Sequence, residues 1–261
     1  MGLIANKGKP IFPPETNVNL RQNSSFPTDA AYDLALYEEV GHPDRAVLVV
    51  TIILVFDFKD TTSLSWTATE KTDFMTDFTT ACTKTWGEIF QLTTVNPTPP
   101  AKVAGVVFDI QTRDGGSGHS HWNVLCRKVA SLRQSKTYPG GGGTFSNGEA
   151  EWDSLDLTPA TKKGATTTQR AALHEFGHML GYRDEYPLDP TAIPLDDPNV
   201  FTTAHSTDRD SIMFWGETLY PRHYVFFADW ISSQWIKKDS KNCKGHDWKV
   251  SGTIDTTTAG L

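Results

Sequence analysis

Apolar residues follow one another with few interruptions over residues 47–58, where only Thr51 and Asp57 break the run. A buried stretch of this length predicts one central β-strand or two shorter ones. Further runs with strand character cover residues 103–110, 122–129 and part of 145–157, and clusters of Gly and Pro separate them. The chain is therefore expected to contain a sheet of several strands.

Three segments are predicted to be helices. The first begins near Thr67, whose spacing from Glu70 matches a capping box, in which each side chain bonds a backbone N–H of the first turn. The second covers about residues 167–180. The third opens at Pro221, because a helix does not need the N–H group that proline lacks at this position. The inward stripe of the first helix is Phe74, Phe78, Cys82, Thr85 and Ile89.

The order of these elements predicts an α+β fold, with a mixed sheet that carries the helices. With 38% hydrophobic and 21% charged residues, a chain of 261 residues suits one domain with a buried core. We expect this domain over residues 29–250, with an N-terminal lobe to about residue 181 and a C-terminal lobe at 182–250. Residues 1–28 are expected to form an irregular arm, and residues 251–261 a flexible tail.

Charge and hydropathy exclude several classes of partner. The chain has 31 acidic and 24 basic residues, so its net charge of -7 makes nucleic acid an unexpected partner. No stretch reaches the roughly 18 uninterrupted apolar residues of a membrane span. The first residues lack the basic and apolar regions of a secretory signal peptide, so synthesis in the cytoplasm is expected. A monomer is the expected oligomeric state.

His174 and His178 lie four residues apart in the second predicted helix. Four residues advance about 400° around a helix, so both imidazole rings leave the same face and can reach one zinc ion. Glu175 lies about 100° from His174, where its carboxylate can take a proton from a zinc-bound water molecule and pass it to the leaving amine. One helical turn can thus supply two metal ligands and a general base.

The residues after this turn can supply a third ligand. Gly181 can adopt a positive φ and end the helix, so that the chain turns back toward the metal. A catalytic zinc ion normally has three protein ligands, and both Asp184 and Glu185 lie where the third is needed. The spacing alone leaves the choice between these two carboxylates open.

The sequence resembles the extended zinc motif of the metzincin clan of metallopeptidases at His174 to His178, Gly181 and Asp184. The motif of this chain ends in Asp, which is the form that snapalysin-like bacterial enzymes have. The resemblance implies that Asp184 is the third zinc ligand and that Met213 lies in the Met-turn beneath the metal. It also implies a twisted sheet with two long helices, the second of which carries the motif, above a smaller and mostly irregular lobe with a C-terminal helix.

The resemblance further implies a zinc-dependent endopeptidase that binds its polypeptide substrate extended in the cleft, along a sheet edge within residues 145–157. Several metzincins have a tyrosine two residues after the Met-turn methionine, where this chain has Trp215. Tyr220, Tyr224 and Tyr186 are therefore the candidates for a hydrogen-bond donor to the transition state.

Two further groups of residues have the chemistry of metal ligands. His119 and His121 lie in a glycine-rich loop with Asp114 as the nearest carboxylate in sequence, and a second metal site and a pair of solvated histidines are the two interpretations. The region after the second helix is acidic, but it lacks a calcium-loop motif, so calcium stays an unsupported alternative. Its acidic residues are Asp184, Glu185, Asp189, Asp196 and Asp197.

Two alternative functions remain open beside the peptidase. One is a zinc amidase that acts on cell-wall peptide, which would use the same chemistry. The other is a toxin or effector protease that a secretion or injection system delivers. The second is suggested because the sequence shows no signal peptide, so export would need a signal-independent route.

Overall fold

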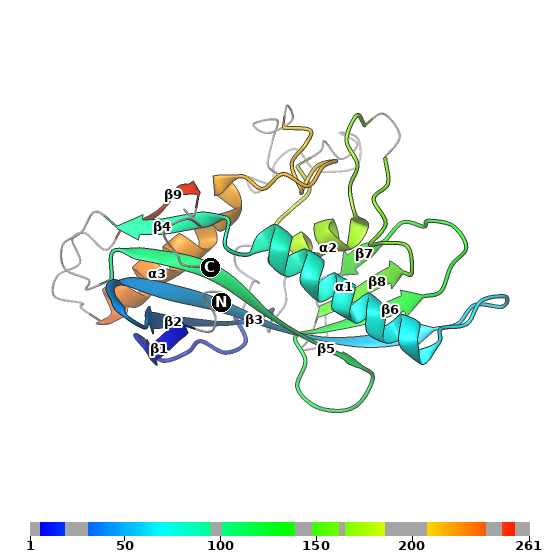
Figure 1. The fold of residues 1–261 in the computed structure, drawn as a ribbon, viewed down its shortest axis with the longest axis horizontal. Coiled ribbons are helices and arrows are strands. Elements are labelled where there is room, and N and C mark those ends of the chain that lie inside the picture. Colours follow the sequence, from blue (N-terminus) through cyan, green and yellow to red (C-terminus); the bar gives the residue numbers. More distant parts are fainter. Residues whose placement is uncertain are drawn as a thin grey trace, which may run out of the picture.

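The computed structural model describes residues 6–18, 31–94, 101–138, 148–161, 165–185, 208–238 and 247–253. Within these residues the chain forms a nine-stranded sheet and three α-helices, which confirms the predicted α+β fold with a mixed sheet (Figure 1). The strands are β1 (Lys7–Pro10), β2 (Asp33–Glu39), β3 (His42–Lys59), β4 (Phe90–Thr94), β5 (Val103–Asp114), β6 (Trp122–Arg127), β7 (Lys136–Tyr138), β8 (Gly148–Asp153) and β9 (Trp248–Thr253). The helices are α1 (Ala68–Trp86), α2 (Ala171–Met179) and α3 (Val225–Lys238), and a 3₁₀ turn at Pro221–Tyr224 leads into α3.

Strand β3 is the centre of the sheet, as its apolar run predicts. The strand order is β7-β8-β6-β3-β5-β4-β9, and β5 lies parallel to β3 along one edge. Two strands share the other edge of β3 end to end. Antiparallel β2 pairs with it as far as Thr51, and parallel β6 pairs with it from Leu54 onward. The backbone of Ile53 therefore lies at the junction between β2 and β6.

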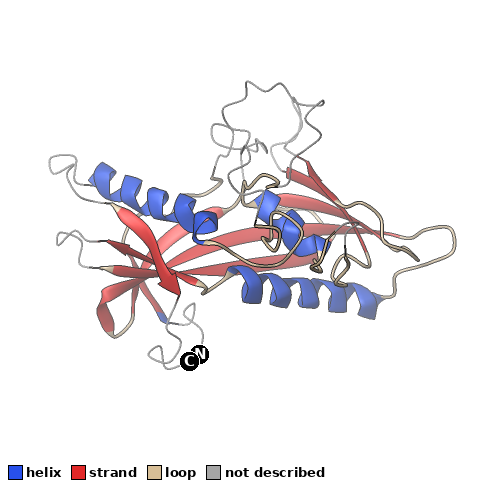
Figure 2. Cartoon of the chain, turned by 90° about the horizontal axis from the view of Figure 1, so that it is seen from above, coloured by secondary structure: helices blue, strands red, loops and turns tan. Residues whose placement is uncertain are grey.

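All three helices pack on the same face of this sheet. Phe56 on β3 contacts the rings of Phe74 and Phe78 on α1. Phe108 on β5 contacts Phe176 of α2 and Phe227 of α3. Figure 2 shows α1 and α3 along different parts of the sheet, with α2 beside α1. Helix α2 is thus held over the middle of the sheet by aromatic contacts with its neighbours.

Helix α1 begins as the sequence predicts. The Thr67 hydroxyl accepts from the Glu70 N–H at 3.2 Å, and the Glu70 carboxylate accepts from the Thr67 N–H at 2.9 Å, which completes the capping box. The predicted stripe is buried at Phe74, Phe78 and Cys82. In the last turn Trp86 rather than Thr85 is buried, and Ile89 lies beyond the end of the helix. Trp86 is fully buried, and its indole N–H donates to the Leu173 carbonyl of α2 at 3.2 Å. The end of α1 therefore holds the start of α2.

Several expectations about the fold are wrong. Helix α2 covers only Ala171–Met179 rather than residues 167–180, so the helix that carries the motif is short, and α1 before it is long. Strand β1 lies inside the arm that was expected to be irregular, and residues 251–253 belong to β9, which pairs with β4. Residues 11–18 also pack on α3: the ring of Phe12 lies 4.8 Å from that of Trp235.

Candidate metal centre

His174 and His178 face the carboxylate of Asp184. The His174 Nε2 atom lies 3.0 Å from Asp184 Oδ1, and the His178 Nε2 atom lies 3.4 Å from the same oxygen. The two histidines are buried, and one ligand atom from each of the three residues lies within 4.8 Å of the others. Ligand atoms that bind one zinc ion tetrahedrally at about 2.0–2.1 Å are about 3.3 Å apart, so this spacing suits such an ion.

The other nitrogen of each ring faces a backbone carbonyl. His174 Nδ1 lies 2.8 Å from the oxygen of Ile212, and His178 Nδ1 lies 2.7 Å from the oxygen of Tyr182. A carbonyl oxygen only accepts hydrogen bonds, so each Nδ1 must carry a proton and donate it. In the neutral ring the lone pair is then on Nε2, which faces Asp184. Metal-binding histidines usually have this second contact, which fixes the tautomer and the direction of the ring.

Asp184 reaches the two histidines because the chain reverses after α2. Gly181 has a φ of 99°, as expected of a helix-ending glycine, and the Tyr182 N–H donates to the Gly177 carbonyl at 3.1 Å. Burial on its own would raise the pKa of Asp184, but the two histidines lower it by a larger amount, because a ring that is also protonated on Nε2 donates to the carboxylate and is positively charged. The carboxylate is thus anionic, as a metal ligand requires.

Glu185 is held by a different set of groups. Its carboxylate oxygens accept from Arg222 at 2.6 and 2.8 Å in a bidentate ion pair, and one of them lies 3.2 Å from His223 Nε2. Burial alone would raise the pKa of Glu185, but Arg222 and His223 lower it. The Glu185 N–H also donates to the Met213 carbonyl at 2.8 Å. Of the two carboxylates that the spacing leaves open, the structure brings Asp184 to the histidines and Glu185 to Arg222.

Glu175 lies on the same helical turn as the two histidines and is 6% exposed. Its Oε2 atom is buried, and no group of the described part of the chain donates a hydrogen bond to it. The backbone carbonyl of Glu175 accepts from the Thr137 hydroxyl of β7 at 3.3 Å. A buried carboxylate oxygen without a donor from the protein can accept a proton from another molecule.

Met213 lies in a tight turn that packs against α2. Within this turn the N–H groups of Phe214 and Gly216 both donate to the Ser211 carbonyl, at 2.9 and 3.1 Å. Met213 is fully buried, and a Cβ atom at Gly177 would come within 2.3 Å of its sulfur. Glycine at this position therefore lets the turn approach the helix closely.

Gln169 is a residue of the site that the sequence does not reveal. Its side-chain amide donates to the carbonyl groups of Ile212 and Gly216, both at 2.8 Å, and lies 3.5 Å from His174 Nδ1. The buried amide thereby holds the turn whose Ile212 carbonyl faces His174. A single glutamine before a helix carries no spacing or motif that predicts this role.

The candidate transition-state donors are not supported by the hydrogen bonds of the structure. The Tyr224 hydroxyl donates to the Trp86 carbonyl, and the side chain is fully buried, so Tyr224 does not suit this role. The Tyr220 hydroxyl donates to Asp210 at 2.8 Å, and this bond raises the pKa of Tyr220 to about 12. Tyr186 lies outside the described residues, as do Asp189, Asp196 and Asp197 of the acidic region considered for calcium.

The second histidine pair meets a carboxylate other than the expected one. His119 and His121 lie close to Asp33 at the start of β2, and the ligand atoms of the three are within 4.8 Å of one another. Asp114, the carboxylate nearest in sequence, instead forms an ion pair with Lys71 at 3.0 Å. The described residues thus contain two groups of three side chains that could hold a metal ion.

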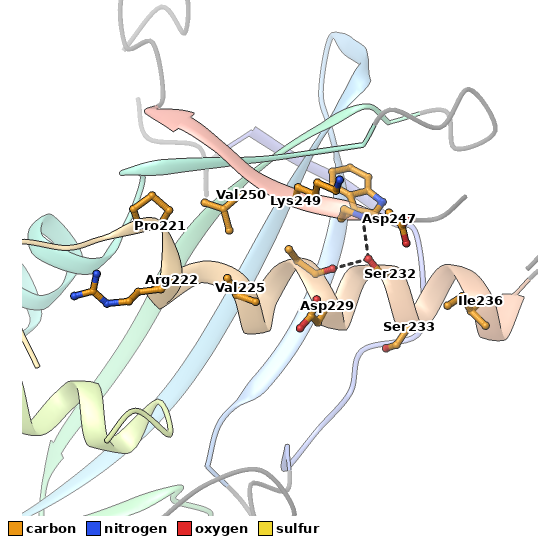
Figure 3. A pocket seen from close by; sticks show the side chains of 12 residues that line it. Pro221, Arg222, Val225, Asp229, Ser232, Ser233, Ile236, Asp247, Lys249 and Val250 are labelled. Atoms are coloured by element: carbon orange, nitrogen blue, oxygen red, sulfur yellow. Dashed lines mark hydrogen bonds between the residues drawn. The ribbon is translucent and has the colours of Figure 1, made fainter. Parts of the chain in front are cut away.

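A cavity of about 630 Å³ lies between α3 and β9, and none of the six residues of the two groups lines it (Figure 3). Its wall is partly apolar, with Val225, Ile236 and Val250, and Asp229 and Asp247 are among its polar side chains. The Ser232 hydroxyl accepts from the Trp248 N–H at 2.9 Å and joins the helix to the strand. The residues that line this cavity include no histidine or cysteine, so they do not add a metal site.

A scan against protein-family models found no family that matches the chain, and a search of curated proteins found no significant match. None of the helices in the described ranges is long and apolar enough to cross a membrane. The function of this chain is therefore inferred from the chemistry of its own residues.

Proposed function

We propose that this protein is a zinc-dependent endopeptidase of the metzincin type. The observation that carries the proposal is the convergence of His174, His178 and Asp184, with each histidine held in the tautomer that points Nε2 at the shared centre. Two imidazoles and one carboxylate are a usual set of ligands for a catalytic zinc ion, which keeps a further position open for water or substrate.

Glu175 is the residue that separates a catalytic site from a structural one. A structural zinc site needs ligands but no base, whereas Glu175 provides a buried carboxylate oxygen one residue from a ligand. Zinc, when bound, polarises the substrate carbonyl and makes water acidic enough to act as a nucleophile near neutral pH. Glu175 would accept the proton at Oε2 and deliver it to the amine nitrogen of the leaving peptide.

The substrate is proposed to bind as an extended strand beside β7. Among the described residues this strand is the outermost one on its side of the sheet, and the hydroxyl of its residue Thr137 donates to the Glu175 carbonyl. The edge was expected within residues 145–157, but the strand in this range is β8, and β7 pairs with residues 149–151 of it. A peptide that pairs with the outer edge of β7 would lie along the helix that carries Glu175, and backbone pairing demands little of the side chains.

The features that favour a metzincin-type enzyme are the buried Met213 turn, its contact with Gly177 of α2, and the chain reversal that brings Asp184 back to the histidines. The short α2 and the N-terminal strands β1 and β2 differ from the expected architecture.

The test is a pair of variants, Glu175→Gln and Glu38→Gln, assayed on an unstructured protein and on purified cell-wall peptide. Glu38 is an exposed glutamate on β2 and serves as the matched control. Removing a general base lowers turnover by about 10²–10⁴-fold, so we expect this loss for Glu175→Gln with an unchanged zinc content, and parental turnover for Glu38→Gln.

Normal turnover in Glu175→Gln would remove Glu175 from the mechanism. A parent that hydrolyses only cell-wall peptide would replace the endopeptidase with an amidase that uses the same site. A parent that takes up no zinc would reject the metal centre itself.

A further inference from the structure

Asp33, His119 and His121 form a cluster that resembles the first centre in its spacing. His121 Nε2 lies 3.1 Å from Asp33 Oδ1 and 3.3 Å from His119 Nε2. Tetrahedral zinc ligands at about 2.0–2.1 Å from the ion are about 3.3 Å apart, so both distances suit neighbouring ligands of one ion. The first centre lies on α2 and the residues that follow it, whereas this cluster lies at the start of β2 and in the loop before β6.

The backbone fixes two sides of this cluster. At the junction of β2 and β6, the His121 N–H donates to the Ile53 carbonyl at 2.9 Å, and the Ile53 N–H donates to His121 Nδ1 at 2.9 Å. Arg113 donates to the carbonyl groups of Gly118 and His119, at 3.0 and 2.9 Å, and thereby holds the loop. The groups are therefore positioned by strands and by a clamped loop, rather than by the chance approach of long side chains.

Charge and exposure also suit a cation. His121 is fully buried, so this side of the cluster is closed to solvent. Asp33 is about a quarter exposed and accepts the Asn17 N–H at 2.8 Å, which orients its carboxylate. His119 is exposed, so its ring can meet an ion that arrives from solvent. A simple hydrogen-bonded lock between β2 and β6 would need only His121 and Asp33, whereas His119 adds a third side chain with a nitrogen that can bind a metal ion.

We propose that Asp33, His119 and His121 form a second site for a divalent transition-metal ion such as zinc. Imidazole and carboxylate ligands suit these ions. The site would link the start of β2 to the loop before β6, two segments that lie 88 residues apart in the chain. Because a clip over so long a loop restricts the unfolded chain, the bound ion would stabilise the fold.

The tautomer of His121 sets the strength of this site. The Ile53 N–H donates to His121 Nδ1, so a neutral ring keeps its proton on Nε2, where it faces Asp33. A metal ion at Nε2 must displace this proton. A neutral ring would then carry its proton on Nδ1, so the hydrogen bond from the Ile53 N–H would have to break. His174 and His178 have the opposite arrangement, with Nδ1 facing a carbonyl oxygen. The second site should therefore bind zinc more weakly than the first.

The experiment counts zinc ions per chain after equilibration at a series of buffered free-zinc concentrations. The proteins are the parent, His119→Ala, His178→Ala, the double variant of these two, and the exposed histidine control His42→Ala. We expect a strong and a weak binding step in the parent and in the control. His119→Ala should lose only the weak step, His178→Ala only the strong one, and the double variant both.

Asp33→Asn provides a second measurement, because an amide oxygen can still accept the hydrogen bonds of Asn17 and His121 while the anionic ligand is lost. Zinc should raise the unfolding temperature of His178→Ala. The double variant Asp33→Asn, His178→Ala should need a zinc concentration at least about tenfold higher for the same rise in unfolding temperature. An unchanged weak step in His119→Ala, or a parent with only the strong step, would overturn the second site and leave the proposed function intact. A parent that shows the weak step but no strong step would reject the proposed function and leave the second site in place.

Discussion

Replacing Gly177 by alanine tests the close packing between α2 and the Met213 turn. An added Cβ would lie 2.3 Å from the Met213 sulfur and 2.9 Å from the Trp86 ring, both shorter than normal contacts. The Trp86 ring is fully buried and is held by its bond to Leu173, so it cannot move aside easily. Overpacking of a buried site costs up to about 3 kcal/mol. Alanine recovers about 1 kcal/mol through its higher helix propensity. We therefore expect the free energy of unfolding to fall by about 2 kcal/mol.

The assay is urea unfolding of the zinc-free protein, followed by far-ultraviolet circular dichroism. A double-mutant cycle with Met213→Ala identifies the contact responsible. Met213→Ala alone should cost about 2–5 kcal/mol, because it leaves a cavity in the core. In the double variant the sulfur is gone, so the combined loss should be smaller than the sum of the single losses by about 1 kcal/mol or more. Equal or higher stability of Gly177→Ala, or strict additivity in the cycle, would show that the turn does not pack on α2 as described.

Two further predictions concern carboxyl groups. Asp184→Ala should lower the zinc affinity of the strong step at least tenfold. Glu185→Ala should keep that affinity within a few-fold, but it should lower the stability because Arg222 loses its carboxylate partner. If Glu185→Ala weakens zinc binding in titrations and Asp184→Ala does not, Glu185 is the ligand. Burial raises the pKa of Asp156 to about 7. A raised pKa means that the folded state holds the proton more tightly, so this group's contribution to stability is lost as pH rises from about 4 to about 7. The free energy of unfolding of Asp156→Asn minus that of the parent should therefore be larger at pH 8 than at pH 5. An equal difference at both pH values would contradict the raised pKa of Asp156.

The sequence predicts the elements whose signals are local. The capping box at Thr67, the apolar run of β3 and the proline that opens the last helix each depend on residues within one segment, and the structure confirms them. The same holds for the reversal at Gly181, because a positive φ is a property of one residue.

The elements that the sequence misses depend on partners far along the chain. Strand β9 is short and pairs with β4, which lies far earlier in the chain. Strand β7 has only three residues and pairs with the next strand, β8, so it is too short to give a clear pattern. The partner of His121 is Asp33 rather than Asp114, because antiparallel β2 brings a residue 88 positions away to the loop. Gln169 acts through carbonyl groups more than 40 residues later. No periodicity within a segment can reveal such contacts.

The carbonyl of Ile212 has a consequence for the order in which the metal centre matures. His174, His178 and Asp184 lie within one short stretch, but the oxygen that fixes the His174 ring comes from 38 residues later. Chains are made from the N-terminus, so a growing chain can form the helix before that oxygen exists. Until residues 211–216 fold against the helix, the His174 ring is free to take either tautomer. We therefore expect the proposed zinc centre to bind its ion tightly only late in folding, when residues 211–216 have packed against the helix.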